Sequence, residues 1–142
     1  MGDRTFCRIT IAARHQSKLG QLLEEEGFTE QDDSNNPAVT DYTNSEANYG
    51  GSSTLDALHG KHRPFTGYHE AGGDYGPAVF AYDGSRYAEC AALGQEPVCL
   101  VDPSGKPNPH SLADARAYLS INKLATTKMT KARAKTPARR KA

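Results

Sequence analysis

Basic side chains are concentrated near the C-terminus of this chain. Seven Lys and Arg residues fall among Ala and Thr, with no acidic or aromatic residue between them: Lys128, Lys131, Arg133, Lys135, Arg139, Arg140 and Lys141. Such a segment neutralises phosphates and releases counterions, which gives salt-dependent affinity for nucleic acid or nucleoprotein without reading base sequence. A solubilising extension, or a charge partner for the protein's own acidic residues, would use the same composition.

A glycine-rich loop at 67–77 gathers a second set of chemically capable side chains: Tyr68, His69, Glu70, Asp74 and Tyr75. Polar and aromatic residues on a loop that joins two strands are typical of binding surfaces, so we interpret this loop as a partner-binding surface. An acid–base pair of His69 with Asp74 or Tyr75 would make a small enzyme instead. His69 and Glu70 are adjacent on an extended segment and point to opposite faces, which argues against their acting together. An ordinary long turn is the third interpretation.

Other chemistries have weaker signals. His59, His62 and His69 lie near Asp56 and Glu70, but the first two straddle Gly60, and no Cys pair or HExxH helix accompanies them. We therefore expect no metal site. No GxSxG or GxGxxG motif is present, and the glycines at 50–51 lack the Lys of a phosphate-binding loop, so neither a catalytic residue nor a cofactor is predicted.

The net charge of zero conceals a separation along the chain. Residues 1–124 carry 10 basic and 17 acidic residues, a net charge of −7, and the C-terminal segment carries +7. Six carboxylates cluster within ten residues: Glu24, Glu25, Glu26, Glu30, Asp32 and Asp33. Such an acidic surface is usually just solvated, but it is also able to bind a basic protein or to imitate the phosphates of nucleic acid.

The elements that must position these residues follow from hydrophobic periodicity. Residues 5–13 alternate as a half-buried strand, and leucines at helical spacing predict a helix from His15 to Glu26 with Gly27 as its stop. Further strands are expected at 37–43, as an edge strand, and at 64–68. Asp83-Gly84 predicts a two-residue type I′ turn between strands 78–82 and 85–90, and the apolar run 97–102 predicts a buried strand.

Two capping boxes and the C-terminal composition complete the prediction. Ser53 and Ser111, each followed three residues later by Asp, predict the starts of a short helix ending at Gly60 and of a helix reaching about Leu124. The result is an α+β domain at 1–124, with a mainly antiparallel sheet of four to five short strands and two to three helices packed on it. Residues 125–142 are too polar to offset the entropy of ordering, which predicts a flexible basic tail.

The remaining features concern the cellular compartment of the protein. Cys7, Cys90 and Cys99 lie in apolar surroundings without CxxC spacing and are interpreted as structural thiols of a reducing compartment. Residues that could form a signal peptide or a membrane span are not seen, so a cytoplasmic or nucleoid-associated location without membrane contact is expected.

These observations lead to a primary hypothesis and two rivals. The first is a non-enzymatic accessory protein of bacterial or phage type, whose folded body recognises a macromolecular partner while the tail contacts nucleic acid non-specifically. The second is an inhibitor or adaptor whose acidic body docks on a basic, nucleic-acid-binding site of a larger complex. The third is a small enzyme that uses the 67–77 loop. The oligomeric state has no signal in the sequence.

Overall fold

The structure is a computed structural model that describes residues 4–32, 35–73 and 75–135. Seven strands form one antiparallel sheet in the order β2-β3-β1-β4-β5-β6-β7. Their bounds are β1 Arg4–Ala12, β2 Thr29–Gln31, β3 Val39–Asn48, β4 Phe65–His69, β5 Ala78–Tyr82, β6 Tyr87–Leu93 and β7 Glu96–Pro97. The helices are α1 Gln16–Glu25, α2 Ser52–His59 and α3 Pro109–Lys135, with short 3₁₀ turns η1 at Ala13–His15 and η2 at Tyr49–Gly51. The predicted α+β class with an antiparallel sheet is confirmed.

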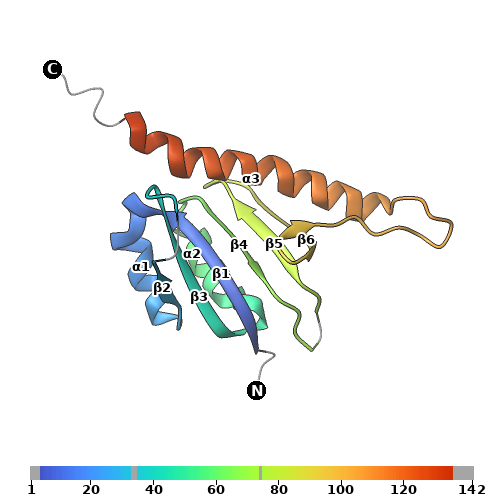
Figure 1. The fold of residues 1–142 in the computed structure, drawn as a ribbon, viewed down its shortest axis with the longest axis horizontal. Coiled ribbons are helices and arrows are strands. Elements are labelled where there is room, and N and C mark those ends of the chain that lie inside the picture. The colour runs from blue at the N-terminus through green and yellow to red at the C-terminus, as the bar shows by residue number, and fades with distance from the viewer. Residues whose placement is uncertain (1–3, 33–34, 74, 136–142) are drawn as a thin grey trace.

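Side chains alternate across the sheet and build a core on each face. On one face, Ile9 and Ile11 of β1 and Phe80 of β5 pack with Leu19 of α1 and Leu58 of α2. On the other face, Val79 and Ala81 of β5 and Cys90 of β6 pack with Tyr118 and Ile121 of α3. The sheet is therefore sandwiched between α1 and α2 on one side and α3 on the other, with α3 crossing the strands (Figure 1).

Helix α1 ends as its sequence predicts. Gly27 takes a positive φ of 94° and donates its N–H to Glu24 O, while Phe28 donates to Leu23 O, the pattern of a Schellman motif. Phe28 is then buried against the leucines of α1. Glu26 accepts hydrogen bonds from the hydroxyls of Ser53 and Thr54, which joins this helix end to the start of α2.

The hairpin at Asp83-Gly84 is confirmed, although its loop is longer than expected. Tyr82 pairs with Tyr87, so four residues rather than two make the turn. The Asp83 carboxylate accepts the backbone N–H groups of Ser85 and Arg86 at 2.8 and 2.7 Å, which closes the wider loop. The strands predicted at 5–13 and 64–68 are also confirmed as β1 and β4.

Two local predictions were wrong. The strand predicted at the sheet edge is β3, which pairs with both β1 and β2, and the edge strand at this side is β2. The run 97–102 is not a buried strand: only Pro97 belongs to a strand, β7, and Leu100 and Val101 are 57% and 63% exposed. The aliphatic composition of that run indicated burial, but Pro97, Val98 and Cys99 are no more than half-buried.

Neither predicted capping box forms. Helix α2 begins after Gly51, which adopts a left-handed conformation, and has no side-chain cap. Helix α3 starts at Pro109, where Asn108 Oδ1 accepts the N–H groups of His110 and Ser111, both at 3.0 Å. Asn before a first-turn Pro is a favourable helix start, and it precedes the one we predicted by three residues.

The boundary between body and tail at 124–125 was also wrong, because α3 continues to Lys135. Ala125 and Met129 are 0% and 1% exposed and extend the buried stripe of Tyr118 and Ile121 at helical spacing. Extending an existing helix avoids the cost of nucleation, and Ala, Lys and Arg are good helix formers. The predicted flexibility at 136–142 lies outside the described residues.

The continuation of α3 can be tested by substitution. Met129→Ala should lower the free energy of unfolding by about 2–5 kcal/mol, because it removes a fully buried side chain and leaves a cavity. Leu119→Ala, on the same helix but 53% exposed, is the matched control and should change it by less than about 1 kcal/mol. Urea unfolding followed by circular dichroism measures both. Equal effects would show that the second half of α3 does not pack on the sheet.

Candidate nucleic-acid interface

Arg14 fixes the C-terminal half of α3 to one end of the sheet. Its guanidinium donates to the backbone oxygens of Lys128 and Met129, both at 2.9 Å. Lys128 in turn donates from Nζ to the backbone oxygen of Asp83, at 2.8 Å. These contacts join the end of β1, the β5–β6 turn and a helix more than 100 residues away in sequence.

Several cations gather at this junction. Burial first, and then the nearby charges of Arg14, Arg63 and Lys18, lower the pKa of His15, which shows that these three cations lie close to one imidazole. A hollow of about 360 Å³ is lined by Arg14, His15, His62, Arg63 and Lys128 together with residues of the β5–β6 turn. We call Arg14, His15, Lys18, His62, Arg63 and Lys128 the basic end.

One carboxylate, that of Asp83, lies next to the basic end, and it already has hydrogen-bond and ionic partners. Burial by itself would raise the pKa of Asp83, but the N–H groups of Arg86 and Ser85 and the charges of Lys128 and Arg86 hold it below its ordinary value. Its outer oxygen also meets Arg86 at 3.3 Å. The basic end therefore keeps an excess of positive charge.

The acidic residues lie at the other end of α1. Glu24 and Glu25 close that helix, Glu30 is on β2, and Asp32 follows β2; all four are exposed. Asp33 lies outside the described residues, and Glu26 contacts the start of α2. We call Glu24, Glu25, Glu30 and Asp32 the acidic end. Lys18 and Glu25 are about two turns apart on α1, so the acidic end begins roughly 10 Å from the basic end.

The predicted C-terminal cations divide into three groups. Lys128 is part of the basic end. Lys131, Arg133 and Lys135 continue along the backbone of α3 from that point, and Arg139, Arg140 and Lys141 lie outside the described residues. Sequence reasoning missed Arg14, Lys18 and Arg63. A signal existed in the antiparallel pairing of Ile11 with Phe65, which brings the residues after β1 and before β4 to the same end of the sheet.

The predicted partner-binding loop does not form a single surface. Tyr68 and His69 are successive residues of β4 and therefore lie on opposite faces of the sheet, with Tyr68 on the α3 side beside the core there. His69 is buried on the other face and its Nδ1 is 2.9 Å from Glu70 O. Glu70 is exposed, and Asp74 lies outside the described residues.

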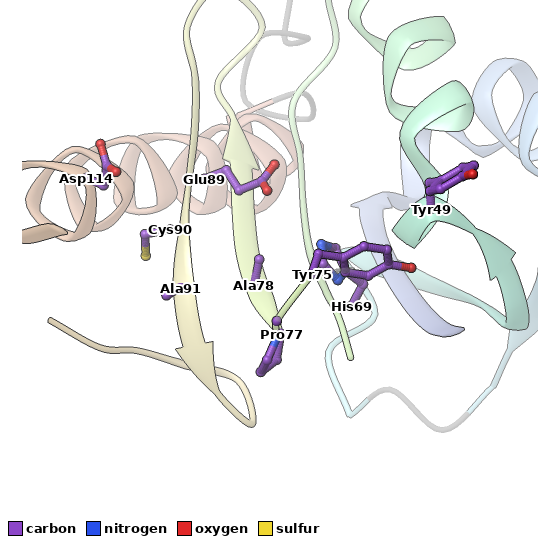
Figure 2. Close-up of a pocket in the computed structure, with 10 residues that line it drawn as sticks. Tyr49, His69, Tyr75, Pro77, Ala78, Glu89, Cys90, Ala91 and Asp114 are labelled. Carbon is purple, nitrogen blue, oxygen red and sulfur yellow. The ribbon is translucent and has the colours of Figure 1, made fainter. Parts of the chain in front are cut away.

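His69 and Tyr75 do meet, at the rim of a hollow of about 450 Å³ (Figure 2). Their rings are edge to face with centroids 5.2 Å apart. Tyr49 and Glu89 also line the hollow, but the Glu89 carboxylate accepts the hydroxyl of Tyr87 at 2.7 Å. The close approach of Gly50 to the His69 ring, where a Cβ would come within 2.8 Å, indicates tight packing around the imidazole. These contacts explain how His69 is held, and they give it no carboxylate partner among the described residues.

The histidines and cysteines show no further convergence. Among the described residues, no three His, Cys, Asp or Glu side chains come together in a way that would hold a metal ion. His59 stacks on Tyr82 with ring centroids 4.7 Å apart. Cys7 and Cys90 are buried on opposite faces of the sheet, and burial raises the pKa of Cys7 to about 12. These positions are those of structural side chains.

Half of the sheet is uncovered on the α3 side, and sequence reasoning did not identify it. Helix α3 contacts β4, β5 and β6 and only the margin of β1. The part of this sheet face that α3 leaves uncovered is called the open face. It consists of side chains of β1, β3 and β4: Phe6, Arg8, Thr10, Asp41, Thr43 and Tyr68. A groove of about 270 Å³ runs between this face and α3.

Comparison of the chain with models of protein families, with curated proteins and with solved structures found no match. No helix in the described parts of the chain has the length and hydrophobicity needed to cross a membrane.

The electrostatics of the basic end predict a pH dependence. Because His15 has a lower pKa folded than unfolded, the native state binds fewer protons, and stability should fall as the pH drops through about 6.5, the unfolded value. By NMR, the His15 titration midpoint should lie below that value. Adding inorganic phosphate, or replacing Lys18 and Arg63 by Gln, should raise it by reducing the local positive charge. If neither change shifts the titration midpoint of His15, these cations do not lie close to its imidazole.

Proposed function

We propose that this protein is a non-enzymatic accessory protein that binds nucleic acid through the basic end and the cationic residues that continue from it along α3. The observation that supports this most directly is the convergence of Arg14 and Lys18, Arg63 and Lys128 from three separate parts of a chain whose body is otherwise acidic. These parts meet because the end of β1, the start of β4 and the β5–β6 turn lie at the same end of the sheet (Figure 1).

Phosphate is the ligand chemistry that suits this arrangement. Lys and Arg at the surface neutralise phosphates and release condensed counterions, and Lys131, Arg133 and Lys135 follow Lys128 along the backbone of α3. At 1.5 Å per residue, the helix from Lys128 to Lys135 spans roughly 10 Å, comparable to several phosphate spacings of one strand. The expected affinity is independent of base sequence and decreases steeply with salt.

The acidic end affects how nucleic acid would approach. Its carboxylates repel phosphate and lie at the far end of α1, so an incoming strand is steered toward the basic end and away from β2. A protein of this kind would act in the cytoplasm or on the nucleoid, where nucleic acid is available.

A second candidate function uses the acidic end itself. Exposed Glu24, Glu25, Glu30 and Asp32 offer a compact negative surface to a basic protein, as in an adaptor or inhibitor that docks on a nucleic-acid-binding site. Charge reversal at Glu24 and Glu30 would abolish that interaction and would not weaken binding to nucleic acid.

The proposal predicts a position-dependent salt effect. The double variant K18Q/R63Q should reduce the slope of log affinity against log salt concentration by about 1–2, because two phosphate contacts are lost. The control R4Q/K106Q removes the same net charge elsewhere, from the start of β1 and the loop before α3, and should leave the slope unchanged. Fluorescence anisotropy with a labelled oligonucleotide across a salt series measures each slope.

A truncation tests the C-terminal segment without disturbing the fold. Ending the chain at Lys135 removes Arg139, Arg140 and Lys141 but keeps Met129 and Lys128, whose contacts hold α3 to the sheet. The slope should fall by about 2–3. If the full chain binds no nucleic acid at low salt, or if the control variant weakens binding as much as K18Q/R63Q, the proposed function is wrong.

A further inference from the structure

The open face contains the sheet's accessible aromatic pair. Phe6 of β1 and Tyr68 of β4 lie on neighbouring strands, half-buried, with ring centroids 5.9 Å apart. The large aromatic residues of the core clusters are otherwise enclosed between the sheet and the helices. Two adjacent rings on a rigid sheet form a platform on which unpaired bases can stack, because every base has a π-face.

Two carboxylates lie near the aromatic pair, and they differ: Asp41 is paired, whereas Glu70 is exposed and close enough to Tyr68 that, besides burial, its charge helps to raise the pKa of that hydroxyl. Asp41 accepts the guanidinium of Arg8 at 2.7 Å and the hydroxyl of Thr10, and it is buried. The remaining side chains of this face are hydroxyls and aromatic rings. Phosphates would therefore approach the platform from the side of Arg8 and Thr10, away from Glu70.

The groove next to this platform is lined by hydrogen-bonding side chains together with Arg8, Val79 and Tyr118. Thr10 and Thr66 come from the sheet, Asn122 and Thr126 from α3, and Gln95 from the β6–β7 turn. Burial raises the pKa of the Tyr68 hydroxyl, so it remains a donor at neutral pH. Hydroxyl and amide groups suit base edges and the ribose 2′-hydroxyl, which acts as both donor and acceptor.

The groove and the basic end are close to each other. Thr126, which lines the groove, and Lys128 of the basic end are two residues apart on α3, and Arg14 follows Thr10 of β1 by four residues. A strand that contacts the basic end is therefore within reach of β1, beside Tyr68 and Phe6.

We propose that the open face binds single-stranded RNA, with unpaired bases stacked on Phe6 and Tyr68 and riboses hydrogen-bonded along the groove. This assignment rests on the proposed function, because the basic end supplies the phosphate contacts. It adds a preference that the basic end alone cannot give: a duplex keeps its bases stacked on one another, and DNA has no 2′-hydroxyl.

The test compares three ligands and three variants of the full chain. Short oligouridine RNA should bind more tightly than oligodeoxyuridine DNA of equal length and than double-stranded RNA. F6L and Y68L keep an apolar side chain of similar size and should each lower the affinity for oligouridine about tenfold, with the salt slope unchanged. Y49L is the matched control, since Tyr49 is an exposed tyrosine on the opposite sheet face, and it should bind as the native chain does.

Photocrosslinking of the native chain provides evidence that does not depend on a variant folding. Oligouridine carrying 5-iodouridine should crosslink to Phe6 or Tyr68, within the tryptic peptides 5–8 and 62–86. Crosslinks confined to other residues, or equal affinity for RNA and DNA, would overturn the assignment. Unchanged oligouridine affinity in F6L and Y68L would overturn it too, while K18Q/R63Q would still reduce the salt slope; loss of all nucleic-acid binding would instead overturn the proposed function.

Discussion

The contact of Arg14 with the backbone of α3 determines how both surfaces of interest are arranged. Its guanidinium reaches the carbonyl oxygens of Lys128 and Met129, at the point where Met129 is buried in the fold. Hydrogen bonds to a charged donor are stronger than neutral ones and more directional, so they set the position of the helix. With its C-terminal half held at the end of β1, α3 covers β4–β6 and leaves the α3-side face of β1 and β3 exposed.

The same contact makes the C-terminal cations part of the fold. A charged segment that is free of the body pays the full entropy of ordering when it binds a ligand. Lys131, Arg133 and Lys135 follow Lys128 in a helix that is already formed, so that part of the cost is removed before any ligand arrives. The helix also carries these charges where its C-terminal carbonyls favour cations.

Local periodicity and turn chemistry were enough to predict the α+β class, α1 with its Gly27 stop, β1, β4 and the hairpin at Asp83. These features depend on neighbouring residues, whose preferences agree with the final structure.

The length of α3 was missed because its last turns depend on one buried Met and one Ala, which composition alone classifies as too little apolar surface. The exposure of Leu100 was missed because burial of a side chain depends on which other elements pack against it. The strand β7 has only two residues and does not extend the sheet as far as Leu100. The capping boxes failed because Ser53 and Ser111 found other partners: Glu26 and the N–H of Leu100.

The candidate sites also combine features that depend on neighbouring residues with features that depend on the tertiary structure. A run of basic residues is visible in a sequence, but the meeting of Arg14, Lys18 and Arg63 requires the strand order, which brings the end of β1 beside the start of β4. The strict alternation of side chains along β4 likewise splits the 67–77 loop: Tyr68 joins the open face, and His69 packs on the opposite side with Tyr75. Tyr68 therefore lies on the same side of the sheet as α3, where it packs beside the core of that face. Its neighbours there are Phe6 and Arg8, which the sequence marked only as the outward-facing positions of an alternating strand. The pairing of β1 with β4 brings these side chains onto one face, and that shared face is the basis of the proposed binding role of the Tyr68 ring.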